Sequence, residues 1–517
     1  MATPDTDIAP PELRLDQVVA HWAIRRPGRA ALRWNDADGM RELSWRGFED
    51  AIAHSAARLA QSIGAGERVA VVCANGAPFH VLVNALWRLG AGVVLIDRNW
   101  GPALVDDLLT LLNCRALFAD PAQAPSPLPP GVARHAIPAP DVAPPRAVRA
   151  EVERGGAADA DSVALYATTS GTTDNPKCVA ITHRQIRTAY RGCLNQHDFS
   201  GFRFSACLFD VNSLGVLGVC FLMPRETGCG TRLFASFSLA NVRATWSSLL
   251  AEPIDFVYLV PPLVRLLNTL AAQPLARVQR MLAFCSAAPV SITELNALES
   301  RFPLTVFNCY GLTELTFAVF FGCRGDDGSP SDSIGHARCI HARLVDDTGR
   351  GVDGAGQGEM YITGPMQTSA YVANERATRA GWQDGWLKTG DIAERDAQGR
   401  FYIRGRKKDV VLRGGYTYYL HELEHYLRRV PEIVDACAFK GRDLPSGDEL
   451  CVVVQVAGKI DPDSLLQWIR SSMGSNKAPN TLYCAQRSLP RNSNGKILRQ
   501  VLSGMHLDGS MAEWAAA

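Results

Sequence analysis

Apolar positions along the first hundred residues follow two alternating periods. Residues 49–62 and 79–89 carry apolar side chains at helical spacing, whereas RVAVVCA (68–74) and GVVLI (92–96) are short runs rich in valine. Helical segments that alternate with short apolar runs are typical of a parallel sheet covered by helices. The pattern therefore predicts an α/β fold for this part of the chain.

The same alternation resumes after a stretch with nine prolines (121–150), which we expect at the surface, and continues to about residue 364. Beyond that point glycines and short β-rich runs become frequent. Residues 409–517 contain VVLRGG, ACAFKG and ELCVVVQV, which are typical of strands, and helical patterns at 422–430 and 462–472. This last part of the chain is therefore expected to form a small α+β unit.

Composition narrows the class of protein. The chain has 517 residues, of which 47% are hydrophobic and 20% charged, so it can bury a large core. Its 53 basic and 52 acidic residues give a formal net charge of +1, which does not resemble a nucleic-acid binder. The apolar run from Leu214 to Met223 is too short for a transmembrane helix and fits a buried core element, and the N-terminus lacks a signal-peptide pattern. We expect a cytoplasmic protein without a membrane span and without a nucleic-acid partner.

The cysteines do not indicate a metal centre or a disulfide framework. There are 14 of them, and none forms a C-x-x-C pair. Cys339 lies between His336 and His341, but no second group of ligands stands nearby in the sequence. Reduced cysteines that act as small buried hydrophobes are expected.

A loop rich in hydroxyl residues follows the strand-like run SVALYA. Residues 168–179 read TTSGTTDNPKCV, with five hydroxyl residues and one glycine in the first six positions and a lysine after them. Backbone N–H groups, hydroxyls and one cation suit a polyphosphate, although the loop is not a Walker A sequence. An ordinary polar loop is the alternative for this segment taken alone.

Four further motifs place charged or aromatic residues in turns. NCYGLTE contains Tyr310, which could stack on a base, and Glu314, which could hold Mg²⁺. GWLKTGD ends in Asp391, a carboxylate suited to ribose hydroxyls. GRKKD follows, and LPRNSNGK ends in Lys496. Each of these motifs alone is equally explained by a solvated turn.

Six motifs together resemble the adenylate-forming superfamily, which comprises acyl- and aryl-CoA synthetases, adenylation domains and luciferases. They are TTSGTTDNPK, NCYGLTE, GEMYITG, GWLKTGD, GRKKD and NSNGK, in the order found in that family, and the resemblance spans residues 20–505. It implies a large N-terminal domain, residues 1–405, of sheets covered by helices, which binds the acid and ATP. It also implies a small mobile C-terminal α+β domain, residues 406–517, which carries the adenylation lysine, with the nucleotide between the two.

The resemblance implies an ATP-dependent acid–thiol ligase. In such enzymes a carboxylate attacks the α-phosphate, pyrophosphate leaves, and a thiol then attacks the acyl-adenylate. The acceptor would be CoA or the phosphopantetheine of an acyl carrier protein, with ATP and Mg²⁺ as cofactors. Because an anion must approach a polyanion, positioning and charge neutralisation should dominate catalysis.

The resemblance also implies roles for residues at the matching positions. The ATP-binding set is Thr169, Ser170, Gly171, Thr172, Thr173, Lys177, Tyr310 and Asp391. The catalytic set is Thr313 at the α-phosphate, Glu314 on Mg²⁺, Arg406 beside the ribose and phosphate, and Lys496 between the substrate carboxylate and the α-phosphate. Lys408 matches the hinge about which the C-terminal domain rotates, and Gly414 and Gly415 match the loop beside the thiol tunnel.

The phosphate loop departs from the family pattern at two positions. Asp174 and Cys178 stand where the phosphate loop usually carries glycines. They motivate an alternative from another class of protein, a nucleotide-binding protein whose catalysis has decayed. Because the cationic and acidic positions are kept, we favour an active enzyme.

The segment CLFDVNSLGVLG bears on the identity of the carboxylic-acid substrate. Phe209-Asp210 copies half of the F-D-x-S pattern of amino-acid adenylation domains, in which the aspartate pairs with the substrate ammonium; a local structural role is the alternative. Leu312 and the segment around GRKKD instead look like acyl- and aryl-acid ligases. By resemblance, the pocket would be lined by Asp210, Leu214, Leu259, Phe284, Ser286, Cys309 and Phe317. A compact aryl or small acyl acid is the first choice, and a stand-alone amino-acid adenylation enzyme that loads a carrier protein is the alternative.

Overall fold

The computed structural model describes residues 8–36, 39–98, 100–119, 128–138, 159–168, 177–211, 214–238, 240–270, 280–413, 416–445, 447–458, 460–473, 478–491 and 496–516. It divides into two compact units. The first comprises residues 1–331, 335–341 and 363–387, and the second comprises residues 332–334, 342–362 and 388–517. The functional boundary expected near residue 405 stays a prediction.

One sheet of the first unit contains the elements expected from the first hundred residues. Its spatial order is β6 (Ala133–His135), β5 (Ala116–Ala119), β3 (Arg68–Val72), β4 (Gly92–Leu95), β7 (Val163–Thr168) and β8 (Cys178–Thr182). All neighbours are parallel except the pair β7–β8. The helices before and between these strands are α2 (Trp45–Leu59), α3 (Ala77–Arg88) and α4 (Pro102–Leu111). The predicted alternation is confirmed, and the element boundaries differ from the expected ones by a few residues.

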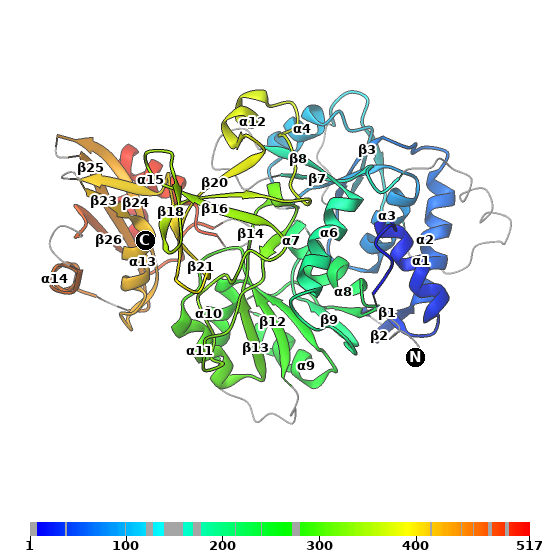
Figure 1. Ribbon diagram of the computed structural model, residues 1–517, viewed down its shortest axis with the longest axis horizontal. Coiled ribbons are helices and arrows are strands. Elements are labelled where there is room, and N and C mark those ends of the chain that lie inside the picture. The colour runs from blue at the N-terminus through cyan, green and yellow to red at the C-terminus, as the bar shows by residue number, and fades with distance from the viewer. Residues whose placement is uncertain are drawn as a thin grey trace. The chain divides into compact units, whose positions relative to one another are not determined.

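A second sheet of the same unit carries the middle of the chain. Its spatial order is β13 (Leu304–Asn308), β12 (Met281–Cys285), β11 (Phe256–Leu259), β9 (Phe204–Cys207), β10 (Gly230–Leu233), β1 (Ala30–Asp36) and β2 (Gly39–Ser44). Only the β1–β2 pair is antiparallel. The helices of this region are α1 (Leu15–Arg25), α6 (His183–Leu194), α9 (Val242–Ala251), α10 (Pro261–Thr269) and α11 (Ile292–Arg301), and the last three lie beside β11–β13 (Figure 1).

The apolar run Leu214–Met223 is buried, as expected, but it is not one regular helix. It forms α7 (Leu214–Leu217), a π-helical turn η1 (Gly218–Leu222) and the start of α8 (Met223–Arg225). Single π-turns inside α-helices occur frequently at functional sites.

A buried ion pair joins this region to the N-terminal segment. The Arg187 guanidinium donates to both carboxylate oxygens of Glu226, at 2.8 and 2.6 Å, and both side chains are 1% exposed. The same guanidinium donates to the carbonyls of Ala9, Pro10 and Leu13. Because its donors are thus satisfied, the charge can be buried at this position.

The second unit contains two sheets. The first, built mainly from this unit, has the order β17 (Gly351–Val352), β16 (His341–Val345), β18 (Gly356–Thr363) and β20 (Trp386–Arg395), and β21 (Phe401–Arg406) pairs with β20. The second has the order β23 (Tyr416–Tyr419), β22 (Val410–Arg413), β25 (Gly447–Val456) and β24 (Ile433–Leu444), and β26 (Thr481–Ala485) pairs with β25.

Strand β25 is buried on both faces, which explains its continuous apolar sequence. Leu450, Val452 and Val454 pack in a core with residues of α13 (Leu420–Leu427) and α14 (Pro462–Met473). Cys451 and Val453 pack in a second core with residues of α15 (Arg499–Asp508) and α16 (Met511–Ala516). The expected α/β class with a smaller α+β part at the C-terminal end is confirmed.

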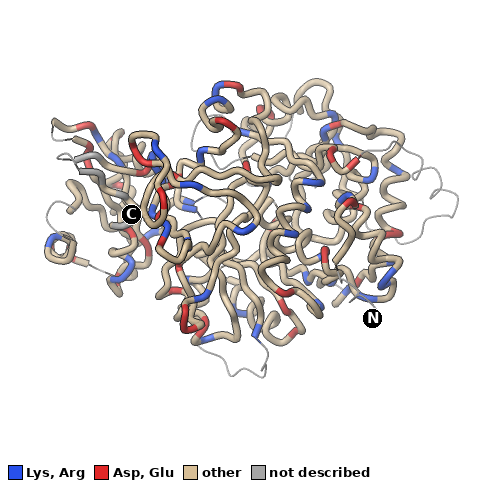
Figure 2. The backbone as a smooth tube through the Cα atoms, viewed as in Figure 1, with Lys and Arg blue, Asp and Glu red and all other residues tan. Residues whose placement is uncertain are grey.

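The distribution of charge and the length and polarity of the helices agree with the composition. Basic and acidic positions are interspersed along the described chain (Figure 2). Among the described residues, every helix is too short or too polar to cross a bilayer.

Candidate active site

Three side chains of the first unit form a chain of polar contacts. The Lys177 ammonium lies over the Tyr371 ring, with 4.9 Å between Nζ and the ring centroid. The Tyr371 hydroxyl donates to Oε1 of Glu314 at 2.5 Å. A cation–π contact and a charge-assisted hydrogen bond thus connect the predicted phosphate-binding lysine and the predicted metal-binding carboxylate to the same tyrosine. No sequence pattern singles out Tyr371, because both partners come from distant parts of the chain.

The backbone around Glu314 is held in place by neighbouring segments. Glu314 lies in a short 3₁₀ turn (Thr313–Leu315), and its carbonyl accepts from the Thr368 N–H at 2.8 Å and the Thr368 hydroxyl at 3.0 Å. Thr316 has a φ of 69°, an unfavourable conformation for a β-branched residue, and its hydroxyl donates to the Met366 carbonyl at 2.6 Å. Strain that the surrounding structure maintains in this way is common at functional sites.

Position 311 of the same motif must be glycine, because a side chain there would not fit. A Cβ there would lie 2.2 Å from the Phe317 carbonyl oxygen and 2.4 Å from the Ala318 Cα. The close approach belongs to a two-stranded ribbon of β14 (Tyr310–Gly311) and β15 (Ala318–Phe320). The ribbon sets the direction of Tyr310, whose ring contacts Phe320 at 6.0 Å between centroids. Stacking of Tyr310 on adenine stays a prediction.

The predicted phosphate loop is described only at its end. Thr169, Ser170, Gly171, Thr172 and Thr173 lie outside the described residues, as does Asp174. Cys178 is 1% exposed and packs in the core beneath the first sheet, where burial raises the pKa of its thiol to about 12. The cysteine that stands at position 178 in place of the family glycine is therefore a core residue.

A second group of predicted residues meets in the second unit. Asp391 on β20 faces Arg406 on β21, and Nε of Arg406 lies 2.9 Å from Oδ1 of Asp391. Asp391 is 3% exposed, and its backbone N–H donates to the Thr389 hydroxyl at 3.0 Å. Antiparallel pairing of the two strands thus joins the predicted ribose-binding carboxylate to the predicted phosphate-region arginine.

Lys496 belongs electrostatically to the same group. Burial and the positive charge of Arg406 lower the pKa of the Lys496 ammonium to about 8; Lys408 acts in the same direction, whereas Asp409 and Asp391 oppose it. Sequence motifs separated by about a hundred residues are therefore assembled into one cluster of charges. Gly414 and Gly415 lie outside the described residues, and the hinge role of Lys408 stays a prediction.

Arg499 anchors the segment that follows Lys496. Its guanidinium donates to Asp409, to Glu424 at 2.6 Å and to the Ala438 carbonyl at 2.7 Å. It therefore connects α15 to α13 and to β24. The sequence offers only a basic residue three positions after the predicted lysine, which does not by itself indicate such an anchor.

The predicted acid-pocket residues of the first unit fall into two places. Leu259, Ser286 and Cys309 follow one another across the carboxyl ends of β11, β12 and β13, where the Ser286 N–H donates to the Leu259 carbonyl and the Cys309 N–H to the Cys285 carbonyl. Ligands of open parallel sheets commonly bind at this edge. The register pairs Leu259 with Cys285, so Leu259 and Phe284 point to opposite faces of the sheet.

Aromatic side chains lie around the ends of these strands. Phe284 is 1% exposed and packs among Phe256, Phe307 and Phe321, while the Tyr258 hydroxyl lies 3.0 Å from Oγ of Ser286. Tyr258 was not predicted as a site residue.

The other place lies at the π-turn. Leu214 begins α7, and a Cβ at Gly218 would lie 3.3 Å from the Phe317 ring and 2.7 Å from the Tyr190 hydroxyl. Tyr190 packs edge-on against Phe317 at 5.3 Å and is fully buried. Its hydroxyl has no hydrogen-bond partner among the described residues, which is unusual for a buried polar group.

Asp210 has a cationic partner within the protein. Nε of Arg98 lies 3.4 Å from Oδ2 of Asp210, and the Asp210 side chain is 18% exposed. Arg98 follows β4, so the contact joins the two sheets of the first unit, and no short-range sequence pattern could have indicated it. The carboxylate charge that would attract a substrate ammonium is therefore already compensated.

Comparisons with known proteins agree with the family resemblance of the sequence motifs. Residues 19–372 match the family described as AMP-binding enzyme. A feruloyl-CoA synthase from Amycolatopsis sp. is 28% identical over 511 aligned residues, which cover 94% of this chain and 98% of the relative. A sulfoacetate–CoA ligase from Cupriavidus necator is 29% identical over 353 residues, which cover 66% of each chain.

Solved structures share the fold. An o-succinylbenzoate CoA synthetase from Bacillus subtilis in complex with AMP superposes with a TM-score of 0.81 at 21% identity, covering 95% of this chain and 98% of the other. An anthranilate CoA ligase in complex with anthranoyl-AMP superposes with a TM-score of 0.82 at 17% identity, covering 97% and 99%. At these identities the likeness concerns the fold alone.

Proposed function

The chain belongs to the AMP-binding enzyme family, and on that premise we propose that it is an ATP-dependent acid–CoA ligase that forms an acyl-adenylate. The observation that carries the proposal is the grouping of Lys496 with Arg406 and Asp391 in the second unit. A lysine beside an arginine and a ribose-type carboxylate suits transfer of a carboxylate oxygen to an α-phosphate, because both reactants are anionic.

In this proposal Lys496 bridges the substrate carboxylate and an α-phosphate oxygen while pyrophosphate leaves. Arg406 and Asp391 bind the ribose and phosphate region, Tyr310 packs on adenine, and Thr313 contacts the α-phosphate. Each group compensates charge or fixes position, which is the main requirement of adenylation.

Mg²⁺ fits the chemistry of Glu314. Carboxylate oxygens are the ligands that Mg²⁺ prefers, and the Tyr371 hydroxyl keeps one of the two in a defined direction. When bound there, the ion would neutralise phosphate charge. Lys177, in contact with the same tyrosine, would supply a second positive charge to the triphosphate.

The proposed acid is a compact aryl or small acyl acid that carries a polar group. The aromatic surroundings of Ser286 and Phe317 support a flat substrate. The buried Tyr190 hydroxyl, which has no hydrogen-bond partner in the described part of the chain, would gain one from a substrate hydroxyl or carbonyl. Tyr190→Phe is then expected to raise KM for a hydroxyl-bearing acid more than for the unsubstituted acid, and an equal rise for both would contradict this role.

CoA is the proposed thiol acceptor, since two relatives that align with most of the chain are named as a CoA synthase and a CoA ligase. An acyl carrier protein is the alternative acceptor. CoA carries a phosphate that a surface Arg or Lys could bind, and Arg404 and Lys440 are candidates by their charge. Both already have acidic partners, because Arg404 pairs with Glu394 and Lys440 pairs with Asp443 and Asp448. Recognition of CoA by other cations is therefore part of the proposal.

Two observations weigh against the competing functions, although Asp174 lies outside the described residues. The amino-acid adenylation hypothesis needs an available Asp210 charge, which Arg98 compensates. The decayed-enzyme hypothesis rested partly on Cys178, which is a core residue.

The deciding experiment is ATP–pyrophosphate exchange with a panel of benzoic, cinnamic, short- and medium-chain and amino acids. Exchange with aryl or acyl acids, strongly lowered in Lys496→Ala, is the expected result. CoA and a phosphopantetheinylated carrier protein are then compared as acceptors of the activated acid. ATP binding without exchange for any acid would contradict the proposal, and exchange confined to amino acids would reinstate the alternative role of Asp210.

A further inference from the structure

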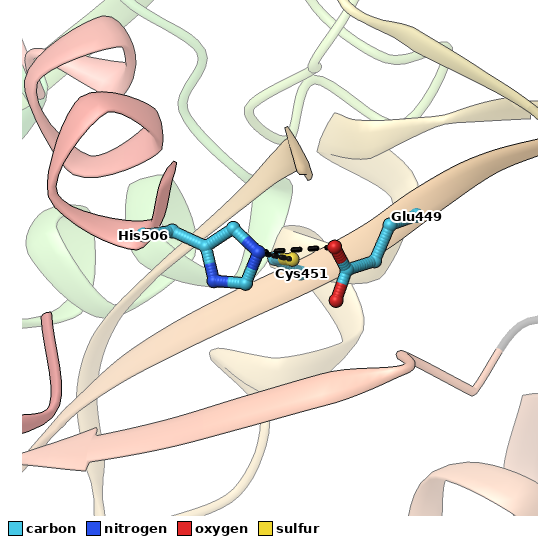
Figure 3. A group of neighbouring side chains, drawn as sticks. All are labelled: Glu449, Cys451 and His506. Carbon is cyan, nitrogen blue, oxygen red and sulfur yellow. Dashed lines mark hydrogen bonds and ion pairs between the residues drawn. The ribbon is translucent and has the colours of Figure 1, made fainter. Parts of the chain in front are cut away.

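Three side chains with metal-binding atoms meet in the second unit, and none of them belongs to the proposed active site. They are Glu449 and Cys451 on β25 and His506 on α15 (Figure 3). Oε2 of Glu449 lies 3.0 Å and Sγ of Cys451 lies 3.5 Å from Nε2 of His506. The side chains converge from two elements that the chain order separates widely, so the sequence pattern predicted no such centre.

The spacing of these atoms suits a small divalent ion. An ion with ligand distances of about 2.0–2.3 Å and tetrahedral angles separates its ligand atoms by about 3.3–3.8 Å. The observed distances of 3.0 and 3.5 Å fall in or near that range. A thiolate, an imidazole and a carboxylate together form a donor set that is typical of Zn²⁺.

Gly441 packs closely against the three donor atoms. The position of a Cβ at Gly441 would lie 2.6 Å from Oε2 of Glu449, 2.7 Å from Sγ of Cys451 and 2.9 Å from Nε2 of His506. Gly441 is not among the glycines with a positive φ, so its backbone conformation suits any residue. Space beside the three donor atoms, and not backbone geometry, therefore requires the glycine.

Outer hydrogen bonds orient two of the donors. Nδ1 of His506 lies 2.9 Å from the Tyr483 hydroxyl, so Nε2 is turned toward the centre of the cluster. The Thr481 hydroxyl donates to Oε1 of Glu449 at 2.8 Å, and the Arg442 N–H donates to Oε2 at 3.0 Å. Partners of this kind fix ligand direction at metal sites, and Nδ1–H would donate to Tyr483 once Nε2 binds an ion.

We propose that Glu449, Cys451 and His506 form a Zn²⁺ site that ties α15 to β25, with water as the fourth ligand. Binding replaces the thiol proton of Cys451 by the ion and releases that proton to solvent. Because α15 follows Lys496 closely, the ion would stiffen the segment that carries this lysine. The proposal does not rest on the proposed ligase activity.

The test is metal analysis of the full chain, purified without a histidine tag from zinc-supplemented medium and dialysed. We expect about one zinc per chain in the wild type and less than about a tenth of that in Cys451→Ser and His506→Gln. Cys484→Ser is the matched control, because Cys484 is a partly exposed thiol on β26 outside the cluster. Gly441→Ala, which presses a methyl group against the three donor atoms and so displaces them, should also lose the zinc.

Cobalt substitution and chelation give readouts that do not depend on activity. One equivalent of Co²⁺ should produce a thiolate-to-metal absorption band in the near ultraviolet in the wild type and in Cys484→Ser, but not in Cys451→Ser. A chelator should lower the unfolding temperature of the wild type and leave that of Cys451→Ser unchanged. Folded wild-type protein with neither bound zinc nor the cobalt band would overturn the proposal, and so would a band that persists in Cys451→Ser.

Discussion

The protonation of Lys496 should control the alkaline side of the pH profile of adenylation. Burial and the nearby Arg406 charge lower the pKa of its ammonium to about 8, Lys408 adds to this effect, and Asp409 and Asp391 oppose it. In the free enzyme about nine tenths of the lysine is then charged at pH 7, about half at pH 8 and about a tenth at pH 9. Because the proposed role needs the charged form, activity should fall as pH rises through this range.

The assay is kcat/KM for ATP in pyrophosphate exchange between pH 6 and 10. A quantity of this type reports groups of the free enzyme, so a fall of about tenfold is expected from pH 7 to pH 9, with the midpoint near pH 8. With saturating ATP the limb of kcat should move to higher pH, because the triphosphate charge favours the ammonium.

Two variants separate this mechanism from other titrations. Lys496→Arg keeps its charge throughout this pH range. The alkaline decrease in kcat/KM should therefore disappear, whatever activity the variant retains. Lys496→Ala should lower exchange strongly at every pH. The same alkaline limb in Lys496→Arg, or a flat wild-type profile up to pH 10, would refute the reasoning.

Three further predictions concern other groups. Glu314→Gln should lower exchange by more than about tenfold and raise the Mg²⁺ requirement, whereas Tyr371→Phe should mainly raise KM for ATP, since it removes only the hydroxyl that orients the carboxylate. Glu226→Gln should lower the free energy of unfolding by about 3–5 kcal/mol in urea titrations, because it leaves the Arg187 guanidinium buried without its counter-charge. Burial lowers the pKa of His183 to about 4, so the folded state resists its protonation, and stability should fall by about 2 kcal/mol between pH 7 and pH 5.

A specific result would contradict each of these predictions. Equal kinetic effects of Glu314→Gln and Tyr371→Phe would mean that the tyrosine does more than orient the carboxylate. An unchanged urea midpoint in Glu226→Gln would mean that the buried guanidinium finds other compensation. His183→Gln should remove much of the loss of stability between pH 7 and pH 5, and an undiminished loss would assign it to other groups.

The local elements and the reaction class were readable from the sequence. Helical and strand periods identified β3, α3 and β4, because burial of one face or both faces imposes a period on the residues that supply it. The order of six short motifs identified the family. The α+β unit at the C-terminal end was also predictable, since β25 is an apolar run flanked by amphipathic helices.

Contacts between distant segments were decided by the tertiary structure. Arg98 meets Asp210, Tyr371 joins Lys177 to Glu314, and His506 meets Glu449 and Cys451, although no spacing in the sequence relates the partners in each contact. The π-turn at residues 218–222 likewise lies in a run of which the sequence predicted only burial. A sequence period reports which face of an element is buried, whereas the partner of a side chain depends on the register and order in which whole sheets pack. That is why the chain by itself determined its elements and chemistry, and only the folded structure determined which charges compensate one another.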